Sequence, residues 1–168
     1  MNSKWQKLGG FEHPSSKISM DKWDKRFLEL AHHVSSWSKD PSTKVGAIIV
    51  DSDRNVRNVS YNGFARGVND TDDRLLDRTL KLLFTNHAES NAIDNCARIG
   101  ISTANCTLYV THFPCASCCI KVIQSGISRI VVDENSLTGD FRERWKDQIS
   151  ASFIMIAEAK LNLTLVKL

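Results

Sequence analysis

Apolar runs of strand length alternate with helical stripes along most of this 168-residue chain. Apolar residues recurring at i, i+3 and i+4 indicate helices, whereas short unbroken apolar runs indicate buried strands. The pattern predicts helices over 21–37, 75–84, 87–99, 115–125 and 141–159, and strands over 45–50, 56–61, 106–111, 127–132 and 163–166.

This order of elements restricts the fold class to a layered α/β domain. The first two strands are joined by a short polar turn, so we expect them to pair as an antiparallel hairpin. The later strands are separated by helices and should run mostly parallel. The length favours a single domain over 1–168, in which residues 1–20 form an irregular N-terminal arm.

Composition excludes several other classes of protein. Apolar residues make up 42% and charged residues 24% of the chain, values typical of globular domains rather than disordered or fibrous ones. The net charge of +3 is too small and too dispersed for a protein that lives on duplex DNA. No apolar run is long enough to cross a membrane and the first ten residues are polar, so we expect a cytoplasmic protein.

Two short motifs stand at the starts of predicted helices, with one predicted strand between them. They are His-Ala-Glu at 87–89 and Pro-Cys-Ala-Ser-Cys at 114–118. Cys115 and Cys118 are three residues apart and share one helix face, and a helix N-terminus favours thiolates. Together with His87 they make three nitrogen and sulfur ligands, the number that a catalytic zinc keeps while leaving its fourth position to water.

Glu89 completes a pattern that is known as the zinc deaminase signature, H-x-E followed by P-C-x-x-C. A carboxylate beside the zinc-bound water can take its proton and deliver it to a leaving amine. A C-x-x-C pair alone is also typical of redox sites and of half a structural zinc site. The matching H-x-E one strand earlier favours the catalytic zinc.

The remaining cysteines and histidines are interpreted as structural. Cys119 follows Cys118 directly and therefore points about 100° away around the helix. We expect Cys96, Cys106 and Cys119 to be packed thiols. We expect His32 and His33 to be surface or core residues, and His112 to shape its loop.

Four segments together resemble the deoxycytidylate (dCMP) deaminases. They read SKDPSTKVGA at 38–47, YNGFARG at 61–67, HAESNAI at 87–93 and LYVTHFPCASC at 108–118. The last two motifs mark any cytidine deaminase-like protein, whereas the first two point to the dCMP branch. The resemblance covers about residues 21–133 and is weak beyond them.

The resemblance implies a three-layer α/β/α cytidine deaminase-like fold with a mixed five-stranded sheet. It also implies a Zn2+ cofactor and hydrolytic deamination of dCMP to dUMP, a step that feeds thymidylate synthesis. His87, Cys115 and Cys118 would be the zinc ligands and Glu89 the proton shuttle. Similar enzymes are homo-oligomers, often hexamers.

Other activities stay open at this point. The substrate could be another cytosine carrier: a 5-modified dCMP, dCTP, cytidine or a base in single-stranded nucleic acid. A polymer substrate is disfavoured, because the four tryptophans are scattered and the charge is only +3. A non-catalytic zinc module would not need Glu89.

Substrate contacts are carried over from the same resemblance. Asn62 would meet the sugar 3′-hydroxyl, although an Asn before a Gly is also a turn former. The Ala88 N–H and the Cys115 carbonyl would hold the pyrimidine edge, with Phe113 and Pro114 beside the base. The candidates for the 5′-phosphate are Thr43, Lys44 and Arg66.

The segment after Asn62 departs from the family pattern. Ala65 stands where the family has Pro, and Val68 where a Cys often follows. In regulated members this region is linked to activation by dCTP and inhibition by dTTP, so these nucleotides are the candidate effectors, and the two departures leave open whether this chain is regulated. Val68 argues against a second, structural zinc there. Leucines at helical spacing within 75–83 indicate either an oligomer face or core.

Overall fold

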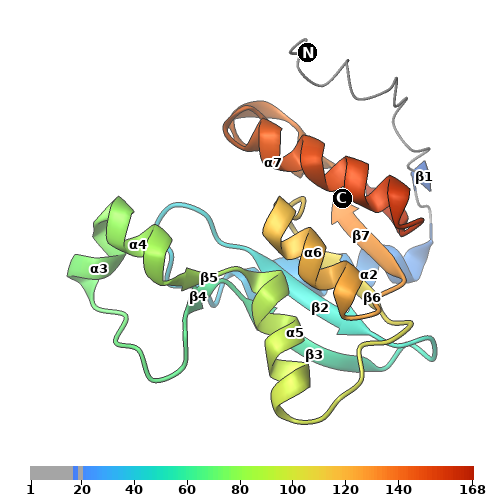
Figure 1. Ribbon diagram of the computed structural model, residues 1–168, viewed down its shortest axis with the longest axis horizontal. Coiled ribbons are helices and arrows are strands. Elements are labelled where there is room, and N and C mark those ends of the chain that lie inside the picture. Colours follow the sequence, from blue (N-terminus) through green and yellow to red (C-terminus); the bar gives the residue numbers. More distant parts are fainter. Residues whose placement is uncertain (1–16, 19–20) are drawn as a thin grey trace.

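The structure, a computed structural model, describes residues 17–18 and 21–168 (Figure 1). Strands and helices alternate as the apolar pattern predicts. The helices are α2 (Lys22–Ser35), α3 (Asp72–Leu76), α4 (Arg78–Phe84), α5 (Ala88–Arg98), α6 (Ala116–Gln124), the 3-10 helix η1 (Glu134–Leu137) and α7 (Gly139–Glu158). The strands are β1 (Lys17–Ile18), β2 (Gly46–Val50), β3 (Val56–Tyr61), β4 (Gly63–Phe64), β5 (Thr85–Asn86), β6 (Thr107–Val110), β7 (Arg129–Asp133) and β8 (Asn162–Val166).

The main sheet has the order β1-β8-β7-β6-β2-β3. Strand β2 is antiparallel to both β3 and β6, whereas β6, β7 and β8 run parallel. The five expected strands and their mixed directions are therefore confirmed. The two-residue strand β1 is added beside β8, so part of the expected irregular arm is a strand, and the rest of the arm lies outside the described residues.

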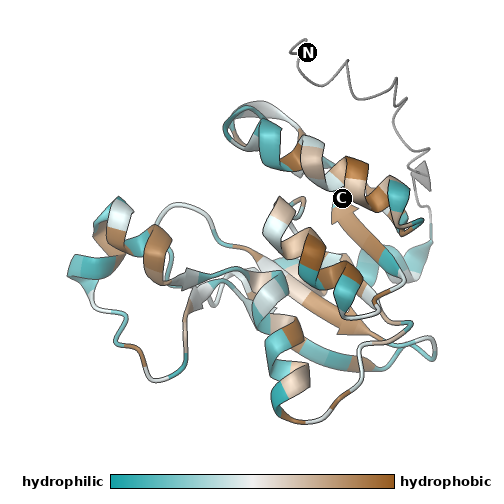
Figure 2. Ribbon diagram, viewed as in Figure 1, coloured by the Kyte–Doolittle hydropathy of each residue, from teal (hydrophilic) through white to brown (hydrophobic). Residues whose placement is uncertain are grey.

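Both faces of the central strands are buried, which makes the domain three-layered. In β2, Ala47 and Ile49 pack with α5 and α6, whereas Ile48 and Val50 pack with α2. Figure 2 shows β2 and β7 in hydrophobic colours and the edge strand β3 largely in hydrophilic ones. Strands covered on both faces read as continuous apolar runs. This is why the sequence signal was clearest for β2, β6 and β7.

Helix α2 ends earlier than the apolar stripe indicates. The stripe continues to Trp37, but the helix ends at Ser35, and the N–H groups of Trp37 and Ser38 bond to carbonyls three residues back. These tighter turns let the chain leave the helix and enter the loop before β2. Trp37 is half exposed rather than core.

The helix expected over 75–84 is instead two short helices, α3 and α4. Asp77 lies between them with an extended backbone, and its carboxylate accepts hydrogen bonds from Thr79 N and Leu80 N, which caps α4. The pair forms an arm that projects from the sheet (Figure 1). Leu76 and Leu83 are 74% and 76% exposed, so within this chain they are not core.

A buried ion pair connects this arm to the loop before β2. Lys81 Nζ of α4 donates to Asp40 Oδ1 at 2.9 Å and to Ser42 Oγ at 2.7 Å. Burial alone would raise the pKa of Asp40, but the hydrogen bonds from Lys81 and from the N–H groups of Ser42 and Thr43 outweigh it and lower this pKa. The carboxylate is therefore the stable form in the fold.

The C-terminal elements follow the expectation within two residues. Helix α7 spans Gly139–Glu158 and β8 spans Asn162–Val166. Within the part of the chain that the structure describes, no helix has the length and apolar character needed to cross a membrane.

Replacing Gly46 by Ala should destabilise the fold. A Cβ at this position would overlap the Ala31 carbonyl oxygen and lie 2.8 Å from Ser35 N, both in the backbone of α2. The helix would have to move, and overpacking of this kind costs about 3 kcal/mol. Thermal unfolding should show a Tm lower by on the order of 10 °C. The control is Gly63→Ala, whose Cβ would meet nothing within 4 Å; an equal loss there would contradict the explanation.

Replacing Asp40 by Asn should cost stability in a pH-dependent way. Near neutral pH the buried Lys81 ammonium loses its charge partner, which costs about 3 kcal/mol. Because the folded-state pKa of Asp40 is lowered, its contribution to stability is present above the unfolded-state pKa of ~4 and is lost as the pH falls through the folded-state pKa. Urea unfolding at several pH values should show the wild-type advantage shrinking below pH ~4.

Asp53→Asn, in the exposed turn between β2 and β3, is the matched control. It should leave the free energy of unfolding almost unchanged. A constant difference between Asp40→Asn and wild type down to pH ~2 would show that the carboxylate charge is not what stabilises the loop.

Candidate metal centre

Two helix N-termini meet at one end of the sheet. His87 is the N-cap of α5 and Cys115 is the N-cap of α6, each with an extended backbone that turns the chain into its helix. His87 follows β5 directly, and Cys115 follows the loop that leaves β6. Neither N-cap side chain makes a capping hydrogen bond to the first turn of its helix, and the His87 ring and the Cys115 thiol lie within 3.4 Å of each other.

The three predicted ligands lie together. The ligand atoms of His87, Cys115 and Cys118 are all within 4.8 Å of one another, and these residues are the one group of at least three metal-ligating side chains among the described residues. His87 Nδ1 lies 3.4 Å from Cys115 Sγ and 3.5 Å from Cys118 Sγ. Tetrahedral zinc holds a nitrogen and a sulfur ligand about 3.5 Å apart. The donor set and its spacing therefore fit zinc.

The thiols have further polar partners. Ser117 Oγ lies 3.2 Å from Cys115 Sγ, and Ser90 Oγ lies 3.6 Å from Cys118 Sγ. Hydrogen bonds from Cys118 and His87 lower the pKa of the Cys115 thiol. Cys115 is thus prepared as a thiolate, the form in which cysteine binds a metal.

Glu89 lies in the first turn of α5, two residues beyond His87, and is only 4% exposed. Burial raises the pKa of its carboxyl to about 7. A carboxyl with such a pKa can both accept and release a proton near neutral pH. The catalytic role expected for Glu89 stays a prediction.

Asn62 holds the loop beside the centre. Its Oδ1 accepts from Val45 N at 2.8 Å, and its Nδ2 donates to Thr43 O at 2.9 Å. Ser38 Oγ also donates to its carbonyl. Asn62 is therefore a structural clamp, and one amide N–H and one lone pair of Oδ1 are left for a ligand.

The other predicted substrate residues occupy different surroundings. Arg66 donates to Asn95 Oδ1 at 2.7 Å, two turns along α5 from Ala88, and is exposed. Phe113 is buried and packs on Phe153 with ring centroids 4.4 Å apart. Thr43 and Lys44 lie in the loop before β2. Ala88 lies in the first turn of α5, and Pro114 lies in the loop after β6.

The cysteines expected to be packed thiols are buried, as predicted. Of the histidines, His32 Nε2 bonds Asp133 Oδ2 at 2.9 Å, and His112 Nδ1 lies 3.0 Å from Thr111 Oγ1. Thr111 Oγ1 in turn accepts from Gly46 N, so His112 belongs to the loop network, as expected. The buried thiols are Cys96, Cys106 and Cys119.

Sequence reasoning missed the part of α7 that lies against this centre. Trp145 packs edge-on against His87, and Gln148 Oε1 accepts from Ala116 N at 3.1 Å. Ser152 Oγ donates to Pro114 O at 3.0 Å. No motif marks these residues, because their helix reaches the centre only through tertiary packing.

Residues 21–134 match the family model of the cytidine and deoxycytidylate deaminase zinc-binding region. The chain belongs to this family. The matched region includes both motifs and spans α2 to β7. The expected family, its fold and its zinc cofactor are thereby confirmed.

Relatives support the same conclusion. The chain is 44% identical over 145 residues to an uncharacterized deaminase of Aliivibrio fischeri, covering 86% of this chain and 94% of that one. It is 42% identical over 114 residues to a probable deoxycytidylate deaminase of Caenorhabditis elegans, covering 66% and 57%, and 34% identical over 116 residues to the human deoxycytidylate deaminase, covering 65% and 63%. The chain thus spans less than two thirds of the length of these two deoxycytidylate deaminases.

A solved structure shares the fold. The dCMP deaminase of cyanophage S-TIM5, in complex with dCMP and dUMP, superposes with a TM-score of 0.67 at 22% identity, covering 88% of this chain and 99% of that one. At this identity the likeness establishes the α/β/α architecture.

Two adjacent cysteines allow the metal site to be tested. Cys118→Ser should reduce bound zinc by at least tenfold, because a serine hydroxyl is a far weaker zinc ligand than a thiolate. Cys119→Ser should leave zinc content unchanged, since this thiol lies 3.8 Å from the Ser152 carbonyl and outside the ligand group. Atomic absorption on purified protein measures both. Equal zinc in the two variants would remove Cys118 from the ligand set.

Proposed function

We propose that this chain is a zinc-dependent hydrolase that converts dCMP to dUMP. The observation that carries the proposal is the juxtaposition of three ligand atoms within 4.8 Å of one another and the buried carboxyl of Glu89. Two further features support it: the family membership and the deoxycytidylate deaminases among the relatives. His87, Cys115 and Cys118 are the proposed zinc ligands.

Zinc held by these ligands would supply a bound water whose pKa is lowered to ~7. The overall reaction adds water to the pyrimidine: the C4–N4 bond breaks, a C4 carbonyl forms and ammonia leaves. Glu89 would accept the two protons of the attacking water in turn, passing one to the ring nitrogen N3 and the other to N4, so that neutral ammonia leaves and the product keeps N3–H and a C4 carbonyl. Burial, which raises the pKa of this carboxyl, favours its uptake of a proton.

Backbone groups at the two helix N-termini would hold the pyrimidine. The Ala88 N–H is the first of α5 and has no partner within the helix. The Cys115 carbonyl accepts from Cys119 N and keeps a second lone pair. One donor and one acceptor beside the ligands can read the O2 and N4 edge of cytosine.

Asn62 would contact the sugar 3′-hydroxyl through its remaining N–H and lone pair, with its amide orientation already set by Val45 N and Thr43 O. For the 5′-phosphate we favour Thr43 and Lys44, which lie in the loop that Asn62 clamps. Arg66 is the weaker candidate, because its guanidinium is held by Asn95.

The assembly, regulation and location stay predictions. We propose a homo-oligomer, with a hexamer as the expected form, in a reducing cytoplasm that keeps the five cysteines as thiols. dCTP and dTTP are the proposed effectors. The exposed leucines of α3 and α4 are the surface that subunit contacts would cover.

Steady-state deamination by the zinc-loaded protein tests the substrate. dCMP should be turned over fastest, ahead of dCTP, cytidine, 5-methyl-dCMP and a cytosine-containing oligonucleotide, each assayed for ammonia release. Addition of dCTP or dTTP to the dCMP assay tests regulation. If the zinc-bound protein does not deaminate dCMP but deaminates another cytosine carrier, the proposed metal chemistry stands and the proposed substrate is wrong.

Glu89→Gln should keep zinc and fold but lower kcat for dCMP by roughly 10²–10⁴-fold, because the amide cannot move the proton. Zinc content and circular dichroism establish that the variant is intact. Glu158→Gln, at the exposed end of α7, is the control and should retain full activity. Full activity in Glu89→Gln would refute the proton-transfer role.

A further inference from the structure

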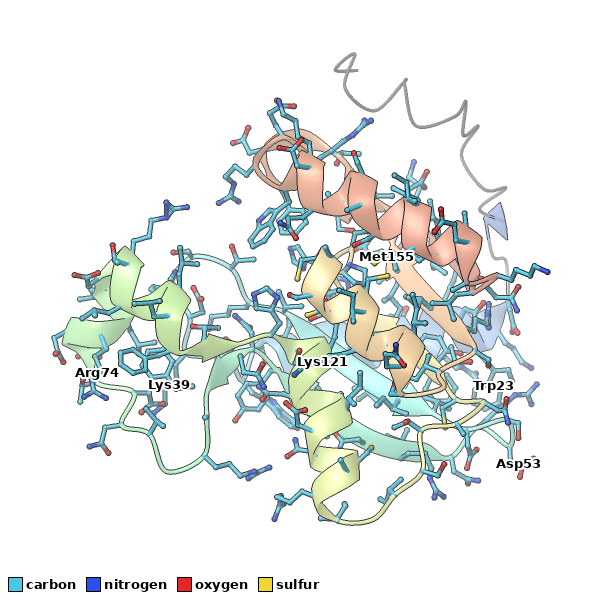
Figure 3. All side chains as sticks on the ribbon, viewed as in Figure 1. Trp23, Lys39, Asp53, Arg74, Lys121 and Met155 are labelled. Atoms are coloured by element: carbon cyan, nitrogen blue, oxygen red, sulfur yellow. The ribbon has the colours of Figure 1, made fainter. Side chains whose placement is uncertain are left out.

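Helix α7 lies outside the family's zinc-binding region, which ends at residue 134, and yet it packs along α6 (Figure 1). Met155 lies on the side of α7 that faces α6 and the sheet (Figure 3). One face of the helix, spaced at i, i+4, i+7 and i+11, carries Phe141, Trp145, Gln148 and Ser152. Residues at this spacing share one face of a helix and can act on one neighbouring surface.

Two hydrogen bonds determine where α7 sits relative to Cys115. Ser152 Oγ donates to the carbonyl of Pro114, the residue before this ligand, and Gln148 Oε1 accepts from the N–H of Ala116, the residue after it. Because both bonds are to backbone, they hold α7 in one register along the Cys115 turn. The Ala116 N–H is one of the α6 donors without an intrahelical acceptor, so Gln148 also satisfies the helix end.

The same register places Trp145 against the histidine of the site. The ring centroids of Trp145 and His87 are 6.0 Å apart with an interplanar angle of 79°, an edge-to-face arrangement. His87 directs Nδ1 to the two cysteines, and Trp145 packs against the same imidazole ring. Phe141 stacks behind Trp145, with centroids 6.0 Å apart, and also meets His112 at 4.7 Å.

We propose that Trp145 is a positioning residue for the metal centre: it holds the His87 imidazole at the angle at which Nδ1 meets the two thiolates. An imidazole on a single N-cap residue can rotate about χ1 and χ2, and a metal ligand that rotates freely binds more weakly. The Trp145 ring removes part of this freedom. This proposal rests on the proposed zinc ligation by His87.

Metal affinity is the direct test. Zinc dissociation constants are measured by competition with a chromophoric chelator, and Co2+ is added to metal-free protein to record its visible absorption, which reports ligand geometry. Trp145→Ala should bind zinc roughly three- to tenfold more weakly and change the Co2+ band intensity. Trp145→Phe keeps an aromatic face and should recover most of both.

Trp37→Ala is the matched control. Trp37 packs edge-on against His33 at 5.8 Å and 81°, the same type of pair, on residues that are not in the ligand group. A general effect of losing a tryptophan would appear in both variants, whereas a positioning effect appears only at Trp145. Equal zinc affinity and equal Co2+ spectra in Trp145→Ala, Trp37→Ala and wild type would overturn the proposal.

His87→Ala separates this proposal from the one on which it rests. Loss of zinc in His87→Ala with wild-type behaviour of Trp145→Ala would reject only the role of Trp145. Undiminished zinc affinity in His87→Ala would reject the ligand assignment, and the positioning role with it.

Discussion

The metal centre depends on two helix N-termini being held side by side at one end of a buried sheet. His87 and Cys115 are N-cap residues of α5 and α6, and their backbones are extended, so their side chains leave the helices and turn to the space between them. The strands beneath, buried on both faces, keep the helices in place. Small changes in that packing would separate ligand atoms that lie 3.4–3.5 Å apart.

Polar groups buried around the centre serve two different purposes. Glu89 has a carboxyl whose pKa burial raises to about 7, which is unfavourable for a structural acid but suitable for moving a proton. Asp40 is also buried, but its partner Lys81 and two backbone N–H groups lower its pKa and keep it charged. Hydrogen bonds and the Lys81 charge therefore outweigh desolvation at Asp40, whereas desolvation outweighs the groups that lower the pKa at Glu89.

Segments outside the two motifs pack against the centre and its neighbouring loop. The loop before β2 is held by Asn62 from one side and by Lys81 of the projecting arm from the other. Helix α7 adds Gln148 and Ser152 on either side of Cys115. These contacts join residues distant in sequence, and they explain how segments without a motif contribute to one site.

Much of the fold could be predicted from the sequence because its signals are local. The apolar run of β2 and the stripe of α2 report burial directly, and only the end of α2 differed, where the backbone of Trp37 turns away from the helix. The projecting pair of helices α3 and α4 was predicted less well. Asp77 caps a second helix there, and a capping residue inside an amphipathic stripe looks the same in sequence as an exposed helical position.

What the sequence determined by itself is the family and its zinc-binding motifs, since H-x-E and P-C-x-x-C at helix starts predict the ligand types, their count and an acid beside them. Only the tertiary structure decided which other side chains reach it. Arg66 is held by Asn95, Asn62 clamps a loop, and Trp145 meets His87. Short motifs are encoded within a few residues, whereas such contacts depend on how distant helices and strands pack, which no local pattern records.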